Sequence, residues 1–335
     1  MSESVKWTNK ALISWTSSFF AKKGIENPKL EAELLLSHAS GISRLDLFMA
    51  YEDEPTEAQR VQFRDLVRRR AQGEPAAYLI GAKEFYSIGF NVGPGVLIPR
   101  PETEQLVLET IEYFKGRGWR TGSDGVKRRS LAIEERLARA TGMAPSPSSA
   151  SASAPDESGT LYLCDVGVGS GCISAALAGN IPSARVLALD VSPAALSIAA
   201  DNLKRLKLDD RVELRESDLF SAVPDDLFEN ERFDAIVSNP PYVSEAEYAA
   251  LEPTVRDYEP RVALVGGPSG AEIALELVRQ AADRIKVGGR LALELSPTTV
   301  DIVAQALDSD PRWREVAVRK DFAGLQRFVI AFRQP

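Results

Sequence analysis

The chain has 335 residues, of which 44% are hydrophobic and 26% are charged, and these are the proportions of a globular protein of one large or two modest domains. Its formal net charge of −8 argues against a dedicated nucleic-acid-binding protein, which would normally carry a basic face. No apolar run approaches the length of a membrane span, and the first residues lack the pattern of a secretory signal. We therefore expect a cytoplasmic protein without direct contacts to nucleic acid or membrane.

Two residue types that often carry chemistry are scarce. The cysteines, Cys164 and Cys172, cannot form a disulfide framework, and their apolar and glycine neighbours predict buried free thiols. His38 is the only histidine and lies in an apolar helical pattern, which predicts a place on a helix surface or at the edge of a core. Without a second histidine we expect neither a metal site nor a catalytic triad.

The first third of the chain predicts a helical domain and a connector. Apolar residues recur at helical spacing from about residue 7 to 72, which predicts a small helical bundle within residues 1–80. Short β-rich runs around turn residues at 85–98 predict a hairpin, and an amphipathic helix through Leu106 and Ile111 follows it. Hairpin and helix together form an expected connector at 81–115.

Residues 116–160 differ from the rest of the chain. A stretch rich in arginine and lysine, in which a short helix at 130–140 is possible, precedes a run of Ser, Pro and Ala at 144–155. Because this composition offers little to bury, we expect a disordered insertion. Two interpretations stay open, a solvated linker and a basic arm that contacts a partner.

From residue 161 to 335 strands and helices alternate, which indicates an α/β domain with a mostly parallel sheet and helices on both faces. The expected strands are 161–166, 185–190, 212–216, 233–237, 290–295 and two final strands near 313–319 and 326–332, which a turn at 321–327 connects. The expected helices start at 171 and cover 194–206, 271–285 and 298–307.

Residues 163–173 predict a strand, a glycine-rich turn and the start of a helix. Glycines let the backbone turn sharply and pass close to a ligand. Two features differ from the dinucleotide-binding pattern G-x-G-x-x-G: the third glycine comes one residue earlier, and an acidic residue precedes the first glycine. Judged on this loop alone, an NAD- or FAD-binding loop stays the alternative. The turn consists of Gly167, Val168, Gly169, Ser170 and Gly171.

The next two expected strands also end in residues suited to a ligand. Asp190 follows the glycine loop by about 20 residues, at a position where a carboxylate can accept hydrogen bonds from both ribose hydroxyls. The third strand is followed by Asp218 and Leu219. A polar group there can meet an adenine amino group while Leu219 covers the ring.

The fourth strand ends in Asn239-Pro240-Pro241-Tyr242. Neither proline can donate to a sheet ladder, so the strand must stop there and leave Asn239 at the carboxyl edge, where open α/β folds place their ligands. The Asn239 carboxamide oxygen and the Pro240 carbonyl are two acceptors that can hold a planar NH2 group, and Tyr242 offers a face for stacking. Taken alone, Asn-Pro can simply be a turn.

The ordered set of four strand ends resembles the class I S-adenosylmethionine-dependent methyltransferases, and within them the HemK/PrmC group of protein-glutamine N5 methyltransferases, which modify peptide chain release factors. The resemblance covers nearly all of the chain outside 116–160. It includes residues 73–78, the Ile-Pro-Arg-Pro-Glu-Thr-Glu segment at 98–104, and residues 258–267. Val168 departs from the pattern, because the family usually has Thr there.

The resemblance implies a Rossmann-like catalytic domain with a seven-stranded sheet at 161–335. It also implies S-adenosylmethionine bound by residues 167–171, Asp190, Asp218, Leu219 and Asn239, with S-adenosylhomocysteine as product. The acceptor would be the glutamine of the Gly-Gly-Gln motif of class 1 release factors, methylated by direct displacement at the Asn239–Tyr242 motif. The helical leader, 1–80, would recognise the rest of the factor, and we expect a monomer.

Several alternatives stay open. A ribosomal-protein glutamine methyltransferase shares the Asn-Pro-Pro-Tyr motif and a helical leader, and a DNA or RNA adenine-N6 methyltransferase acts on the same planar NH2. A non-catalytic module that docks a partner through the leader is a further possibility. For Arg100 and Glu102, a structural ion pair that joins the hairpin to the core competes with a functional role.

Overall fold

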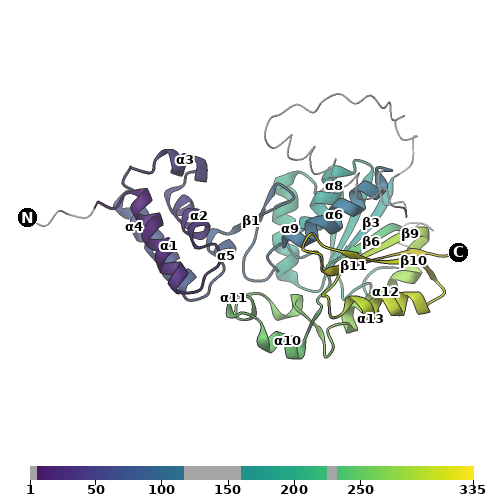
Figure 1. Ribbon diagram of the computed structural model, residues 1–335. Coiled ribbons are helices and arrows are strands. Elements are labelled where there is room, and N and C mark those ends of the chain that lie inside the picture. Colours follow the sequence, from purple (N-terminus) through teal and green to yellow (C-terminus); the bar gives the residue numbers. More distant parts are fainter. Residues whose placement is uncertain (1–5, 117–159, 225–231) are drawn as a thin grey trace, which may run out of the picture.

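The computed structural model describes residues 6–116, 160–224 and 232–335. The insertion expected at 116–160, with its possible helix at 130–140, therefore falls almost entirely outside the described residues. Figure 1 shows a helical bundle at the N-terminal side and an α/β domain that contains the rest of the described chain. No helix among the described residues is both long enough and apolar enough to cross a membrane.

The five N-terminal helices confirm the predicted helical bundle. Thr8 caps the first helix by accepting a hydrogen bond from the Ala11 N–H, and Thr56 forms a capping box with Gln59 at the fourth. Its apolar core includes Phe20, Leu35, Leu36 and Phe63, whereas His38 is exposed on a helix surface. The helices are α1 (Asn9–Lys22), α2 (Pro28–Ser40), α3 (Arg44–Met49), α4 (Glu57–Ala71) and α5 (Ala76–Ile80).

The large sheet has seven strands and confirms the predicted Rossmann-like topology. Its strand order is β10-β11-β9-β6-β3-β4-β5, and all neighbours are parallel except the pairs that involve β11. The chain order reverses direction between β3 and β6, and open α/β sheets bind their ligands beside such a switch point. The strands are β3 (Leu161–Val166), β4 (Ala184–Asp190), β5 (Val212–Glu216), β6 (Phe233–Ser238), β9 (Ile285–Glu294), β10 (Trp313–Lys320) and β11 (Gln326–Arg333).

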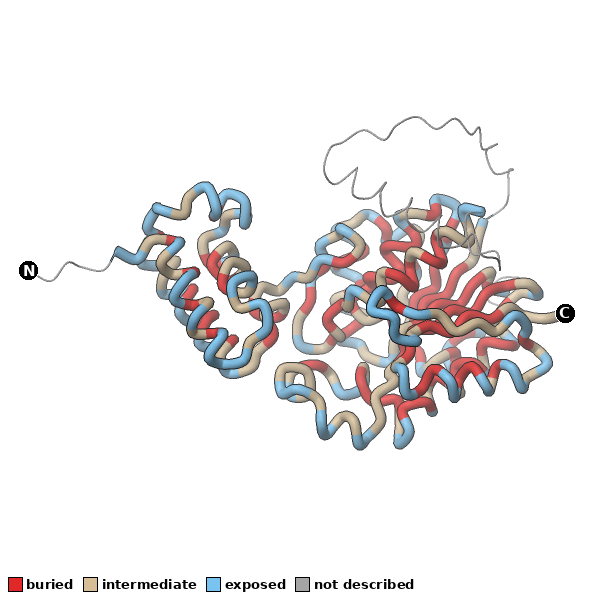
Figure 2. The backbone as a smooth tube through the Cα atoms, viewed as in Figure 1, coloured by how far each residue is buried: buried red, intermediate tan, exposed pale blue. Residues whose placement is uncertain are grey.

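Helices cover both faces of this sheet, as expected (Figure 1). One core cluster joins α6 (Pro101–Phe114), α8 (Cys172–Asn180) and α9 (Pro193–Leu206) to the sheet, and the other joins α12 (Glu272–Arg284) and α13 (Val300–Ser309) to it. Successive strand residues alternate between the clusters, so that Leu163 packs in the first and Cys164 in the second. The buried strands are prominent in Figure 2. Because both faces are covered, the parallel strands are nearly continuous apolar runs.

Both cysteines are free and buried, as predicted. Burial raises the pKa of Cys164 well above its usual value and that of Cys172 to about 12. A thiol with so high a pKa is a poor nucleophile at neutral pH. These residues therefore serve packing.

A hairpin exists in the connector, but it lies earlier than 85–98. β1 (Ala82–Phe85) pairs with β2 (Ile88–Asn91), and the two turn residues, Tyr86 and Ser87, both have positive φ, of 52° and 59°. Neither residue type marks such a turn in a sequence. The Glu104 carboxylate accepts a hydrogen bond from the Tyr86 N–H at 2.9 Å, which stabilises the turn from outside.

The polypeptide between β6 and α12 contains short elements that the sequence did not predict. They are β7 (Val243–Ser244), α10 (Glu245–Ala250), α11 (Pro253–Arg256), a 3-10 helix (Arg261–Ala263) and β8 (Val265–Gly267). β7 pairs with β8 in a separate two-stranded sheet. This excursion returns the chain to the carboxyl edge of the large sheet.

One buried side chain ties the hairpin to the glycine loop. The Asn202 carboxamide accepts from the Asn91 N–H at 2.8 Å and donates to the carbonyls of Asn91 and Ser170, both at 2.9 Å. It is fully buried. Three backbone groups from two segments more than 75 residues apart thus depend on a single side chain.

We predict that Asn202→Ala lowers the free energy of unfolding by at least about 2 kcal/mol, because it leaves buried backbone groups without partners. Urea denaturation measures this loss. Asn180→Ala is the control, since the Asn180 amide donates only within its own helix, to the Ala176 carbonyl, and its effect should stay within about 0.5 kcal/mol. Equal losses in the two variants would contradict the bridging role.

Candidate active site

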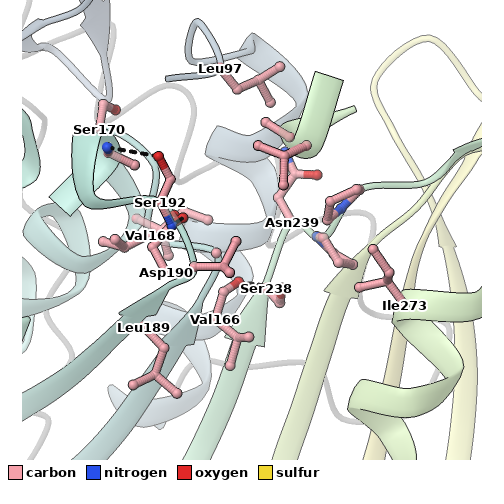
Figure 3. A pocket seen from close by; sticks show the side chains of 18 of the residues that line it. Leu97, Val166, Val168, Ser170, Leu189, Asp190, Ser192, Ser238, Asn239 and Ile273 are labelled. Atoms are coloured by element: carbon pink, nitrogen blue, oxygen red, sulfur yellow. Dashed lines mark hydrogen bonds between the residues drawn. The ribbon is translucent and has the colours of Figure 1, made fainter. Parts of the chain in front are cut away.

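A cavity of about 360 Å³ opens at the carboxyl edge of the large sheet. Figure 3 shows Val168, Ser170 and Asp190 on one side of it and Asn239 on the other. The structure brings nine of the predicted site residues into its lining: Gly167, Val168, Ser170, Asp190, Asp218, Leu219, Asn239, Pro240 and Pro241. Gly169, Gly171 and Tyr242 do not line it.

Gly169 and Gly171 shape the loop rather than the cavity wall. All three loop glycines have φ values in the left-handed region, from 52° to 82°, which side chains disfavour. The Gly169 N–H donates to Asp190 Oδ2 at 2.9 Å. A Cβ on Gly171 would lie 3.4 Å from that of Ala199, so this glycine lets the loop pack closely on α9.

Asp190 accepts a backbone hydrogen bond on each carboxylate oxygen. Oδ2 accepts from Gly169 and Oδ1 accepts from the Ser192 N–H, both at 2.9 Å. Burial raises the pKa of Asp190 above its usual value, and these hydrogen bonds oppose the increase. Each oxygen retains acceptor capacity toward the cavity, because a carboxylate oxygen has two lone-pair sites.

The acidic residue before the glycine loop, Asp165, has a different position. It is fully buried outside the cavity lining, and its Oδ2 accepts from the Ser174 N–H at 3.0 Å and hydroxyl at 2.6 Å. Burial raises the pKa of Asp165 to about 7. Its contacts connect β3 to the first turn of α8, and they hold the glycine loop between these two elements.

The end of β5 contributes Asp218 and Leu219 to the cavity wall. Leu219 has a φ of 49°, in the left-handed region that leucine rarely adopts. The adjacent backbone is held by two side chains, because Ser217 Oγ accepts from the Ala222 N–H at 3.0 Å and Gln280 Oε1 accepts from the Phe220 N–H at 3.2 Å. Such uncommon backbone conformations concentrate at functional sites.

Asn239 presents an unsatisfied acceptor. Its Nδ2 donates to Thr103 Oγ1 at 3.2 Å, whereas its Oδ1 is buried and has no hydrogen-bond partner among the described residues. The side chain lines the cavity directly beside Pro240. Because a buried polar atom without a partner is costly, this oxygen is an available acceptor for a ligand N–H group.

The backbone of the Asn-Pro-Pro-Tyr motif is packed tightly from behind. A Cβ on Gly266 would collide with the Pro241 carbonyl oxygen, and one on Gly270 with that of Tyr242. The Tyr242 ring packs against the core on the α12 side, and burial raises its pKa to about 12. In this structure Tyr242 therefore supports the motif from the core instead of facing the cavity.

The site includes residues that sequence reasoning had not assigned to it. Leu97, Pro99, Arg100 and Thr103, all from the 97–104 segment, line the cavity. The unusual density of Pro, Arg and Glu in this segment was the available signal. Its fold places it over the ends of β3 and β6, which spacing along the chain does not reveal.

Of the two alternatives for Arg100 and Glu102, an ion pair between them is not what the structure has, because the partner of Arg100 is Glu259. Arg100 Nη2 lies 2.5 Å from Glu259 Oε1, and Glu259 Oε2 accepts from the Ile98 N–H at 3.0 Å. Glu259 is 5% exposed, so this pair is largely removed from solvent. It fixes the 97–104 segment to the excursion after β6.

Comparisons with known proteins identify the family of the chain. Residues 11–81 match the PrmC N-terminal domain, and residues 155–256 match the methyltransferase small domain. The chain is 42% identical to the release factor glutamine methyltransferase of Rhodopirellula baltica, over 98% of this chain and 97% of that protein. It is 38% identical to the protein of that name from Chlorobaculum tepidum over the full length of both, and 32% identical to the MTRF1L release factor glutamine methyltransferase of Homo sapiens over 95% of this chain and 85% of that one. This chain therefore belongs to the release factor glutamine methyltransferase family.

Proposed function

We propose that this protein transfers a methyl group from S-adenosylmethionine to the side-chain N5 of the glutamine in the Gly-Gly-Gln motif of class 1 release factors. The names and full-length similarity of its relatives support the substrate. The main structural support for methyl transfer to an amide nitrogen is Asn239, which lines the cavity beside Pro240 and has a buried Oδ1 without a hydrogen-bond partner among the described residues. An acceptor in this position suits a planar amide NH2.

The residues around the cavity fit S-adenosylmethionine. The left-handed glycine loop allows close approach of the ligand to its backbone, Asp190 can accept from ribose hydroxyls, and Asp218 and Leu219 can hold the adenine. When bound, this cofactor supplies an electrophilic methyl group. The cavity volume of about 360 Å³ is within the range of small-molecule sites.

Asn239 and Pro240 would prepare the acceptor nitrogen. An amide nitrogen is a weak nucleophile because its lone pair is delocalised into the carbonyl group. Hydrogen bonds from its two N–H groups to Asn239 Oδ1 and the Pro240 carbonyl would return electron density to nitrogen and hold it in one orientation. Such positioning can lower a reaction barrier by about 7–11 kcal/mol.

The N-terminal domain offers a surface for the rest of the substrate protein. A groove of about 1090 Å³ runs between α1 and α4, and Trp15, 54% exposed, lines it beside Phe19 and Phe63. Basic residues around this groove outnumber acidic ones, which favours an acidic segment with apolar side chains. The glycines that flank the target glutamine let its backbone come close to the cavity but define little of a partner.

The substrate is tested by incubation of the full-length enzyme with labelled S-adenosylmethionine and, separately, a class 1 release factor, ribosomal proteins and DNA. Mass spectrometry should place one methyl group on the glutamine of the Gly-Gly-Gln motif. Labelling of a ribosomal protein or of DNA, with none on the release factor, would replace the assignment by one of these alternatives.

The same assay tests the groove. Trp15→Ala should raise the KM for the whole release factor and leave the KM for a short Gly-Gly-Gln peptide unchanged. Phe48→Ala is the control, because Phe48 is an exposed aromatic residue of the same domain, 62% exposed and outside the groove. Equal changes with both substrates would give the groove a purely structural role.

Asn239→Ala should reduce kcat by at least about 10²-fold, the loss that follows removal of one preorganised hydrogen-bonding group at a reacting centre. Because Asn239 acts on the acceptor, the affinity for S-adenosylmethionine should stay within a few-fold of wild type. Single-turnover kinetics and calorimetry measure the two quantities. A near-normal kcat would exclude this role of Asn239.

Asp190→Ala should weaken S-adenosylmethionine binding by about 1.5–3 kcal/mol, because charge-assisted hydrogen bonds to the ribose are lost. The Gly169 N–H also loses its acceptor, so the loop is loosened as well. Isothermal titration calorimetry measures the affinity, with the exposed Asp209→Ala as control. Unchanged affinity in Asp190→Ala would remove Asp190 from the cofactor site.

A further inference from the structure

A buried carboxyl group lies behind the Asn239 carboxamide. Glu294 is the last residue of β9, and β9 pairs with β6 so that Leu293 lies opposite Ser238. Glu294, which follows Leu293, and Asn239, which directly follows β6, therefore reach the same edge of the sheet. Glu294 is 1% exposed, lies outside the cavity lining, and has an Oε2 with no hydrogen-bond partner among the described residues.

Thr103 stands between these two groups. Its hydroxyl accepts from Asn239 Nδ2 at 3.2 Å, and the same side chain lies close enough to the Glu294 carboxyl to lower the pKa of Glu294 by hydrogen bonding. Thr103 lines the cavity and is itself 3% exposed. Asn239, Thr103 and Glu294 thus form a chain that leads from the acceptor site into the protein interior.

We propose that Glu294 is a positioning residue, which acts through the Thr103 hydroxyl to decide which end of the Asn239 carboxamide faces the substrate. This inference rests on the proposed function and deepens it. A carboxamide has a donor end and an acceptor end of nearly the same shape, so packing alone does not choose between them. Only the acceptor end can receive an N–H group of the substrate glutamine.

The direction of the hydrogen bonds makes this choice. An ionised carboxylate only accepts, so it takes the one hydrogen of the Thr103 hydroxyl. The Thr103 oxygen must then accept from Asn239 Nδ2, which turns Oδ1 toward the cavity, as the structure has it. When Glu294 is protonated it can donate to Thr103, the Thr103 hydroxyl can donate to Asn239 Oδ1, and the amide NH2 then faces the NH2 of the substrate.

The surroundings place this switch near neutral pH. Burial, with a smaller contribution from Glu102, raises the pKa of Glu294 to about 7, although the Thr103 hydrogen bond and the cations of Arg327 and Arg100 oppose the increase. Arg100 and Arg327 are themselves paired with Glu259 and Asp321, and the Tyr242 hydroxyl, with a pKa of about 12, stays neutral here. The carboxylate is present above the pKa, so kcat/KM should decrease as the pH falls through about 7.

Full-length variants test the proposal in a pH profile of kcat/KM with a Gly-Gly-Gln peptide. Glu294→Gln keeps the shape of the side chain, but its amide can donate as well as accept. It should lower kcat/KM at pH 8 by about 10–100-fold, the loss seen when the outer partner of a metal-ligating side chain is removed. It should also abolish the decrease of kcat/KM at low pH, the acid limb of the profile. Thr103→Val should do the same. Thr103→Ser, which retains the hydroxyl, should keep both the activity and its decrease at low pH, and cofactor affinity should be unchanged in Glu294→Gln, because Glu294 lies outside the cavity lining.

A second measurement does not depend on activity. In ¹⁵N-labelled protein, the side-chain NH2 resonances of Asn239, identified by their loss in Asn239→Ala, should shift with a midpoint near pH 7 in wild type and not in Glu294→Gln. A Glu294→Gln variant with wild-type kcat/KM, an intact acid limb or an unchanged NH2 titration would overturn the proposal. Wild-type protein that methylates no glutamine at pH 8 would instead overturn the proposed function, and the NH2 titration would still decide the role of Glu294.

Discussion

The stiff end of β6 is the constraint on which the site depends. Pro240 and Pro241 cannot extend the ladder, and Ser238 donates its hydroxyl hydrogen to the Val166 carbonyl at 2.5 Å, which joins the end of β6 to the end of β3. The glycine loop follows β3, so the same contact sets the distance between the two sides of the cavity. Behind the prolines, Gly266 leaves no space into which the chain could relax. The Pro240 carbonyl and the backbone of Asn239 are therefore held in place, whereas the orientation of the Asn239 carboxamide depends on its side-chain contacts.

Three carboxyl groups at this edge, of which Asp165 and Glu294 are buried and Asp190 is partly exposed, differ because their hydrogen bonds differ. Asp165 has two donors from Ser174 and connects β3 with α8. Asp190 has two backbone donors and remains open to the cavity. Glu294 interacts with one hydroxyl, and burial holds its pKa near neutrality. The same chemical group thus supports the fold, faces a ligand, or sets the polarity of a neighbouring amide, depending on the donors around it.

Much of the catalytic domain could be predicted because its signals are local. Parallel strands buried on both faces are continuous apolar runs, and the glycine loop, Asp190 and Asn239 each follow such a run directly. These residues therefore reach the same edge in any right-handed α/β sheet. Nine of the predicted residues consequently share one cavity.

The rest depends on contacts between distant segments. Arg100 and Glu259 are 159 residues apart, and no pattern in either segment identifies the other as its partner. Glu294 resembles any polar residue at the end of a strand until β9 is placed beside β6. The hairpin was misplaced because its turn, at Tyr86 and Ser87, depends on a hydrogen bond to Glu104 rather than on turn-forming residues. Gly93, Pro94 and Gly95 are turn-forming residues and suggested a turn between two strands, but the segment that contains them forms no strand.

The two domains are coupled through the segment that lines the cavity. The buried Tyr78 hydroxyl, from the last helix of the N-terminal bundle, donates to the Val96 carbonyl at 2.5 Å, and Gly95 and Leu97 on either side face the cavity. From the catalytic side, the Tyr258 hydroxyl donates to the Gln72 carbonyl at 3.3 Å.

Tyr258 is the neighbour of Glu259, which holds Arg100. Gln72 also lines the groove between α1 and α4, so one hydrogen bond joins this groove to Tyr258 and, through its neighbour Glu259, to Arg100 at the cavity.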